Sequence, residues 1–310
     1  MKKFIILPDI TCDLSEQIRD FFGLEDYIRG HVHINDDSFS TTLDWSQIER
    51  DAFYKALSDK KSTVSSAAAS PEEYYQAFRK YAEDGYDILS MSISSSISGT
   101  YGIATSAAER IRQDYPECNI YCLDTRRMSG SFGLLVAYAC ELRSQGKTFE
   151  QVIEWLEQNK VRVHQMGPID DLTIVARRGQ ISVSKAVMGN LVGIKPMGDC
   201  NNDGYVSVLA KAKGIKRALN ATVAYLKEMA IDPEQQYIFI MHSNREKFAL
   251  TLKELVESTV SCKKVFVSDV FSGCGTNIGA GMVSLYFLGQ PITEDMSKEK
   301  QTLERALCDK

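Results

Sequence analysis

Short apolar runs alternate with amphipathic stretches along the first half of the chain. Strands are predicted for the runs over residues 4–7, 28–34, 87–93 and 120–123. Helical periodicity predicts helices over residues 71–83, 100–112, 132–144 and 149–159. Strands that alternate with helices usually pair in parallel, because each helix crosses back over the sheet. We therefore predict an α/β fold whose first part has a mainly parallel sheet flanked by helices.

Two of these helices carry clear start signals. Ser70-Pro71-Glu72-Glu73 is a capping box with proline at the first helical position. Thr148 followed by Gln151 repeats the capping pattern. The helices should therefore begin at residues 71 and 149.

The second half predicts another α/β unit. Strands are expected over 161–164, 172–175, 206–209, 237–241 and 265–270, and helices near 184–191, 215–229 and 246–260. The turn-rich segment 198–204 predicts a hairpin, so this sheet is expected to be mixed. A chain of 310 residues exceeds the usual size of one core. We expect an N-terminal domain over 1–160, a C-terminal domain over 161–290 and a charged helical tail over 291–310.

Composition and charge narrow the class of protein. Apolar residues make up 44% and charged residues 25%, as in globular proteins, and the net charge of -5 argues against nucleic acid as a partner. No apolar stretch reaches the roughly 18 residues that a membrane span needs. The eight cysteines are scattered without a Cys-x-x-Cys pair, which favours reduced thiols and a cytoplasmic location.

Hydroxyl and glycine residues gather where predicted strands end. The run Ser94 to Tyr101 follows one strand and leads into a helix, whose first N–H groups can bind an anion. Similar loops lie at 9–13, 62–66, 124–130 and 272–281. The carboxyl ends of strands line the ligand crevice in open α/β sheets, so these loops are expected to converge. Helix capping alone is the alternative for any one of them.

The sequence lacks the common nucleotide-binding motifs and leaves a hydrolase function open. Gly273, Gly275 and Gly279 have the wrong spacing for a dinucleotide site, and the chain has no phosphate-binding Gly-x-x-x-x-Gly-Lys motif, so no cofactor is expected. An acyl or phosphoryl hydrolase with Ser98 as nucleophile and His242 as base stays open as the alternative function. The Gly-x-Ser-x-Gly elbow of many hydrolases is absent from the sequence.

Two further clusters allow two interpretations each. His31 and His33 point to one face of a strand near Asp36 and Asp37, as metal ligands or as exposed strand histidines. Spacing identifies no further ligand, so no metal is assigned. The arginine pairs 126–127 and 177–178 follow predicted strands, where they either bind an anion or are solvated loop charges.

Taken together, these segments resemble the DegV family of bacterial fatty-acid-binding proteins. Ser94 to Tyr101 matches the family pattern Ser-Ser-x-x-Ser-Gly-Thr-Tyr. The segments 9–13, 66–71, 124–133, 178–182 and 193–196 and the closing glycine loop agree in order and spacing. The resemblance extends to about Gly289 and implies two α/β domains that hold a long-chain fatty acid between them.

The resemblance also implies which residues bind the ligand. The carboxylate is expected at Ser66, Ser98, Gly99 and Asn277, with accessory contacts from Thr63, Ser95, Thr276 and Gln180. Asn277 and Gln180 stand where the family commonly has histidine and arginine, so both can donate hydrogen bonds without supplying positive charge. The tail wall is expected from residues 186–188, 191–192 and 282–287.

A tail of about 15 methylenes contributes roughly 12 kcal/mol of burial before association costs. The resemblance implies that a separate, ATP-dependent fatty acid kinase phosphorylates the bound acid. The chain would then be a lipid carrier without enzymatic activity or cofactor, for which transient contact with a membrane is allowed.

Overall fold

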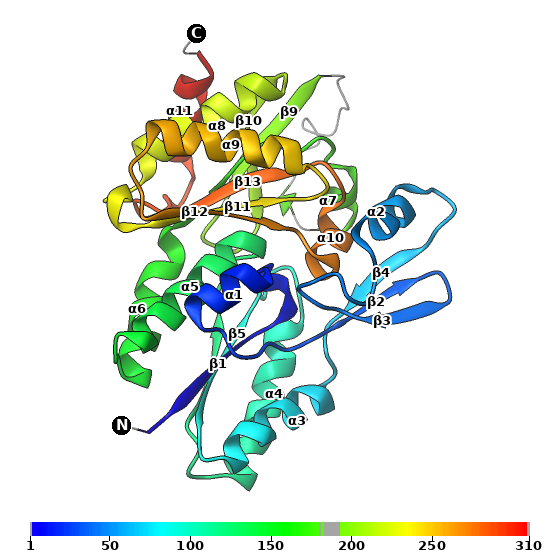
Figure 1. Ribbon diagram of the computed structural model, residues 1–310, viewed down its shortest axis with the longest axis vertical. Coiled ribbons are helices and arrows are strands. Elements are labelled where there is room, and N and C mark those ends of the chain that lie inside the picture. The colour runs from blue at the N-terminus through cyan, green and yellow to red at the C-terminus, as the bar shows by residue number, and fades with distance from the viewer. Residues whose placement is uncertain (1, 180, 183–192, 309–310) are drawn as a thin grey trace.

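The computed structural model describes residues 2–179, 181–182 and 193–308, and its first part has a parallel sheet. The strands β1 (Phe4–Pro8), β5 (Asp87–Ser92) and β6 (Ile120–Asp124) pair in the order β1-β5-β6. Helices α3 (Pro71–Glu83) and α4 (Thr100–Asp114) cover one face, and α1 (Glu16–Phe22), α5 (Ser129–Ser144) and α6 (Phe149–Asn159) lie on the other (Figure 1). The predicted parallel sheet with flanking helices is confirmed.

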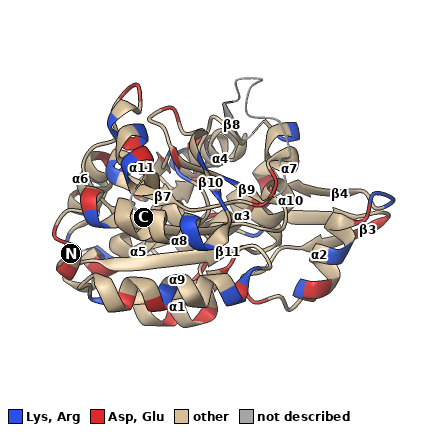
Figure 2. Ribbon diagram, turned by 90° about the horizontal axis from the view of Figure 1, so that it is seen from above, with Lys and Arg blue, Asp and Glu red and all other residues tan. Residues whose placement is uncertain are grey.

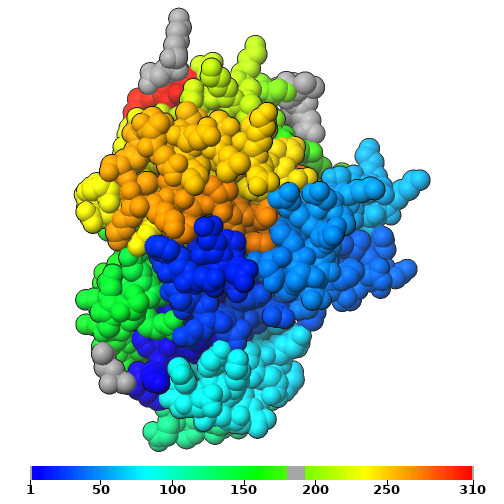
Figure 3. Space-filling model, viewed as in Figure 1, coloured from blue at the N-terminus to red at the C-terminus, as the bar shows by residue number. Residues whose placement is uncertain are grey.

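A small antiparallel sheet projects from this part (Figure 3). It consists of β2 (His31–Ile34), β3 (Asp37–Ser40) and β4 (Val64–Ala67) in the order β3-β2-β4, with α2 (Arg50–Ser58) beside it. We call residues 31–67 the arm. The prediction that residues 28–34 join the parallel sheet is wrong, because Asn35 takes a left-handed φ of 55° and turns the chain into a hairpin.

The second half contains a four-stranded mixed sheet. Its strands are β7 (Val163–Met166), β11 (Tyr237–His242), β12 (Lys264–Asp269) and β13 (Val283–Leu288), in the order β12-β11-β13-β7. Strand β13 runs antiparallel to both of its neighbours. Helices α8 (Ile215–Met229) and α9 (Glu246–Thr259) cover its outer face. The mixed sheet expected for this half is therefore present.

A third sheet lies beside β7. It consists of β8 (Ile181–Ser182), β9 (Ile194–Cys200) and β10 (Val206–Lys213), and the predicted hairpin joins β9 to β10. The short helices are α7 (Thr173–Arg177), α10 (Ser272–Ile278), η1 (Ile10–Cys12), η2 (Lys160–Arg162) and η4 (Pro233–Gln235). The strand predicted over 172–175 is wrong, because the Asp171 carboxylate accepts hydrogen bonds from Thr173 N and Oγ1 and starts a helical turn. The helix predicted near 184–191 lies outside the described residues.

Helix α5 lies between the two larger sheets. Its residues 129–140 are all buried, and it contacts β1 on one side and β7, β11 and β13 on the other. The apolar residues of this helix therefore pack against both sheets. The expected domain boundary at residue 161 falls in η2, between α6 and β7, and one apolar core extends across it.

The C-terminal segment ends in α11 (Ser297–Cys308), a helix as expected. It packs against α8 through Leu303, which is fully buried. Buried Glu299 accepts a hydrogen bond from Thr293 N at 2.9 Å. This helix is therefore part of the second half's core and is more than a charged surface tail.

The surface shows mixed charge. Seen from above, basic and acidic positions are interspersed along the outer helices (Figure 2). All eight cysteines fall among the described residues and are free thiols. In the part of the chain that the structure describes, every helix is too short or too polar to cross a bilayer.

Candidate functional site

A cavity of about 260 Å³, partly open to the surface, lies where both halves and the arm meet. Its wall takes residues from the loops after β1, β5 and β6, from β4, and from β7, β9, β10, β13 and α10. The expected convergence of loops and strands from both halves on one hollow is thus present in the structure.

Strand alternation builds the apolar side of the cavity. On β10, Val206 and Val208 face the hollow, and on β13 Ser284 and Tyr286 do so. The intervening β13 residues Val283, Leu285 and Phe287 enter the outer core under α8 and α9. Within the predicted wall segment 282–287, only alternate residues therefore line the cavity. The other two predicted wall segments, 186–188 and 191–192, lie outside the described residues.

Ser66 and Asn277 meet at the polar end of the cavity. Ser66 lies on β4, one residue before the end of the strand, and Asn277 lies on α10. Asn277 Nδ2 donates to Ser66 Oγ at 3.1 Å. Because Ser66 Oγ accepts this bond, its own proton can be donated to a ligand oxygen.

Ser98 lines the same cavity at the start of α4. Its Oγ lies 2.7 Å from Thr100 Oγ1 and accepts a hydrogen bond from Thr100 N at 3.3 Å. The first N–H groups of a 15-residue helix carry partial positive charge at this point. The hydroxyls of Ser98 and Thr100 at this helix start can therefore bind an anion, and Ser66 and Asn277 line the same cavity.

The remaining predicted carboxylate ligands lie outside the cavity wall. Gly99 is the exposed N-cap residue of α4, and Ser95 Oγ donates to Asp124 Oδ2 at 2.6 Å. Thr276 is fully buried and donates to Ser272 O at 2.9 Å. The structure does not bring these three side chains or backbones to the hollow.

The two other predicted accessory contacts are Thr63 and Gln180. Thr63 is exposed near the tip of the arm, where its backbone N donates to Asn35 Oδ1 at 3.0 Å. Gln180 lies outside the described residues. Neither adds a described contact to the cavity.

The sequence analysis missed several cavity residues, among them Thr100, Arg29 and Gln165. Thr100 belongs to the recognised serine-rich motif but was not assigned as a ligand. Arg29 lies exposed at the wall, its guanidinium 5.7 Å from the Tyr27 ring centroid, and Gln165 comes from β7. The strand predicted here ended at residue 164, so the sequence analysis gave no signal for Gln165.

Asp9 fixes the loops on the first-half side of the cavity. Its carboxylate accepts hydrogen bonds from Thr11 N and Ile93 N, each at 2.8 Å. Burial raises the pKa of Asp9, while these bonds oppose the rise. The loops that follow β1 and β5 are thereby tied together.

Asp13 joins three elements around the cavity. It has a left-handed φ of 50°, and its carboxylate accepts from Ser129 Oγ at 2.6 Å and from Phe271 N at 2.9 Å. The residue therefore links η1 to the first turn of α5 and to the residue before α10. Burial raises the pKa of Asp13 to about 7.

This raised pKa predicts a pH-dependent stability. The folded state retains the Asp13 proton up to about pH 7, whereas the unfolded chain loses it near pH 4, so this contribution is complete below pH 4 and is lost as pH rises through 7. We expect the free energy of unfolding to fall by about 2 to 3 kcal/mol from this group between pH 5 and pH 8. Urea denaturation should show a flatter pH profile for Asp13→Asn, and an unchanged slope would contradict the assignment.

Arg127, the second residue of the arginine pair 126–127, is neither an anion ligand nor a solvated loop charge in the structure. This side chain is fully buried, and its guanidinium donates to the carbonyl oxygens of Val163 at 3.0 Å and Asn201 at 3.2 Å. Arg126 is exposed and donates to Asn202 O at 3.2 Å. Arg127 therefore connects the loop after β6 with β7 and the β9–β10 turn.

The residues of the alternative hydrolase are not in contact. His242 lies outside the cavity wall, and its Nδ1 accepts from Arg245 N at 3.4 Å and lies 3.5 Å from Asp269 Oδ1. Burial lowers the pKa of His242. No hydrogen bond joins Ser98 to His242 in the described part of the chain, so the structure offers this pair no support.

The histidine cluster likewise forms no recognisable metal centre. His31 Nε2 lies 2.9 Å from Glu73 Oε1, which ties the arm to the start of α3. The described ranges contain no group of three or more His, Cys, Asp or Glu side chains that could hold an ion.

The cavity is lined by apolar side chains together with hydroxyl and amide groups from both α/β halves, a lining typical of sites for amphipathic small molecules. A family model described as "Uncharacterised protein, DegV family" matches residues 3–290. The chain belongs to the DegV family.

Relatives agree with this assignment in sequence and in fold. A DegV domain-containing protein of Clostridium perfringens is 31% identical over 93% of this chain and 98% of its own length. A fatty-acid-binding DegV family protein from Thermus thermophilus superposes with a TM-score of 0.82 at 21% identity, covering 93% of this chain and all of that one. The fatty acid kinase B3 protein of Streptococcus pneumoniae, solved with linoleic acid, gives 0.78 at 20% identity, with the same coverage.

Proposed function

We propose that this protein is a cytoplasmic carrier that binds a long-chain fatty acid in the cavity. The acyl chain occupies the apolar space between the two halves. The carboxylate lies at Ser66, Ser98 and Asn277, and the bound acid is presented to a separate fatty acid kinase. The observation that carries the proposal is that these three residues, distant in sequence, line one cavity, in which Asn277 bonds Ser66.

The hydrogen-bond pattern supports an anionic head group. Asn277 donates to Ser66, which directs the Ser66 proton elsewhere, and Ser98 stands at a helix N-terminus. These groups are neutral, so the apolar burial of the chain supplies most of the affinity and the polar end sets the orientation. The fatty acids described for the Thermus and Streptococcus proteins support the same class of ligand.

The kinase proposal rests on the Streptococcus neighbour, which is described as part of a fatty acid kinase. The Ser98 end of the cavity is suited to presentation, because the adjacent Gly99 is exposed. A kinase that uses ATP would transfer the terminal phosphoryl group to the carboxylate, yielding an acyl phosphate and ADP. This chain would contribute the bound acid and its orientation.

Mass spectrometry of lipid extracted from the purified protein tests the ligand class. We expect about one long-chain fatty acid per chain. Ser98→Ala and Asn277→Ala should each weaken fatty acid affinity by about 10-fold or more, because each removes a hydrogen bond to a charged group. Ser95→Ala is the matched control, since Ser95 bonds Asp124 outside the cavity, and should bind normally.

An empty protein that shows ester hydrolysis abolished by Ser98→Ala would overturn the carrier proposal. Equal affinities for the Ser98, Asn277 and Ser95 variants would overturn the assignment of Ser98 and Asn277 to the carboxylate.

A further inference from the structure

One polar side chain in the cavity wall is not used by the proposed carboxylate site. Gln165 is only 9% exposed and lies on β7 directly opposite Tyr286 of β13, on the face of the sheet that lines the hollow. The lining of the same cavity includes the apolar residues Val206, Val208 and Met197. An amide group therefore stands beside the space proposed for the acyl chain.

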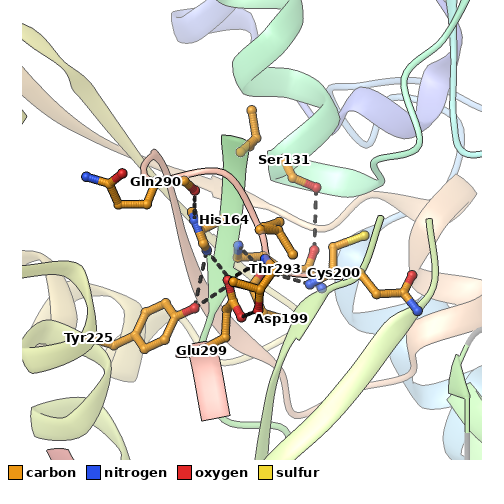
Figure 4. A network of polar contacts seen from close by, with 12 residues as sticks. Ser131, His164, Asp199, Cys200, Tyr225, Gln290, Thr293 and Glu299 are labelled. Atoms are coloured by element: carbon orange, nitrogen blue, oxygen red, sulfur yellow. Dashed lines mark hydrogen bonds and ion pairs between the residues drawn. The ribbon is translucent and has the colours of Figure 1, made fainter. Parts of the chain in front are cut away.

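A buried network around His164 and Asp199 (Figure 4) also includes the backbone of Gln165. Its backbone N donates to Asp199 Oδ1 at 2.8 Å. The other oxygen of Asp199 accepts from Tyr225 OH at 2.8 Å and lies 2.5 Å from His164 Nδ1. Because His164 and Asp199 are fully buried, this part of β7 is fixed before a ligand binds.

Counting protons orients the Gln165 amide. As placed, Gln165 Oε1 lies 3.4 Å from Ser131 Oγ, but the single Ser131 proton is already donated to Met128 O at 2.6 Å. The amide must therefore turn its NH₂ group to Ser131, and a half-turn of the side chain achieves this. The amide oxygen is then left to the cavity, and the described residues provide it with no other partner.

A plain alkyl chain does not satisfy this oxygen. An amide acceptor covered by methylenes loses its hydrogen bond to water and gains none, which disfavours binding. A hydroxyl group on the chain would donate to the oxygen and remove that cost. Ser284, on the same face of β13, adds a second hydroxyl to this wall.

We propose that Gln165 selects long-chain fatty acids that carry a hydroxyl group along the chain. This inference rests on the proposed function, since it concerns the same cavity and names a narrower class of ligand. Gln165 would then determine specificity for the acyl chain, whereas Ser66, Ser98 and Asn277 bind the carboxylate.

Competitive displacement of a fluorescent fatty acid from the delipidated full-length protein tests the inference. The competitors are octadecanoic acid and a series of hydroxyoctadecanoic acids that differ in the position of the hydroxyl. We expect one position, or two adjacent ones, to bind about 10-fold more tightly than octadecanoic acid, a gain equal to one net hydrogen bond. The oxo acid of the same position has no donor and should show no such gain.

Substitutions assign the effect to Gln165. Gln165→Leu should weaken the preferred hydroxy acid by about 10-fold and strengthen octadecanoic acid, so that the preference disappears. Gln165→Met is a second, unbranched replacement, and thermal melting establishes that each variant is folded. Ser66→Ala is the control, because it should weaken both acids by the same factor and leave their ratio intact.

Three results separate the hypotheses. Weaker binding of the hydroxy acids at every position, or a preference that persists in both Gln165 variants, overturns the role of Gln165. If octadecanoic acid binds without any gain from a hydroxyl, the carrier proposal stands and only this inference fails. If no acid displaces the probe, the proposed function itself is wrong.

Discussion

Replacing Val208 with tryptophan is expected to reduce fatty acid affinity by at least about 100-fold. Val208 faces the cavity from β10, so an indole at this position occupies space proposed for the acyl chain. Excluding about four methylenes from the apolar wall removes roughly 3 kcal/mol, which corresponds to this factor. Displacement of a fluorescent fatty acid measures the loss.

The control for Val208→Trp is Lys211→Trp, which places the same side chain on an exposed position of the same strand. Lys211→Trp should bind fatty acid normally, and both variants should melt cooperatively. Unimpaired binding by Val208→Trp would mean that the acyl chain lies elsewhere.

Arg127→Ala should destabilise the protein by more than about 3 kcal/mol. The substitution empties a fully buried site and removes the guanidinium donor from the carbonyl oxygens of Val163 and Asn201, of which Asn201 O still accepts from Gly204 N. Urea denaturation at constant pH measures the change as a lower midpoint with an unaltered slope.

The neighbouring substitution Arg126→Ala is the comparison for Arg127→Ala. Arg126 is exposed and makes one long hydrogen bond to Asn202, so its loss should cost less than about 1 kcal/mol. Equal stabilities for the two variants would show that Arg127 does not join the halves.

Local signals predicted much of the helical structure. The capping boxes at Ser70 and Thr148 place the starts of α3 and α6 where the sequence analysis expected them. Both signals depend on side-chain bonds within three residues, so they operate without tertiary context. The strand predicted for the apolar run over 172–175 was wrong, because the Asp171 carboxylate bonds Thr173 and starts a helical turn there.

The polar end of the cavity was predicted by motif rather than by periodicity. Ser66, Ser98 and Asn277 lie on separate elements, and the position of their loops after predicted strands indicated only that the loops converge. Resemblance to a family brought them together, and the cavity contains all three. Arg127 could not be assigned in this way, because the carbonyl groups that surround it come from segments that only the folded chain brings together.

The position of α5 between two sheets has a consequence for how the molecule denatures. The buried residues of α5 pack into the apolar core of both halves. Unfolding of either half would therefore expose apolar surface of the other. Despite its length and two-part appearance, the chain should therefore lose its structure in a single cooperative transition, and neither half is expected to persist once its counterpart has melted.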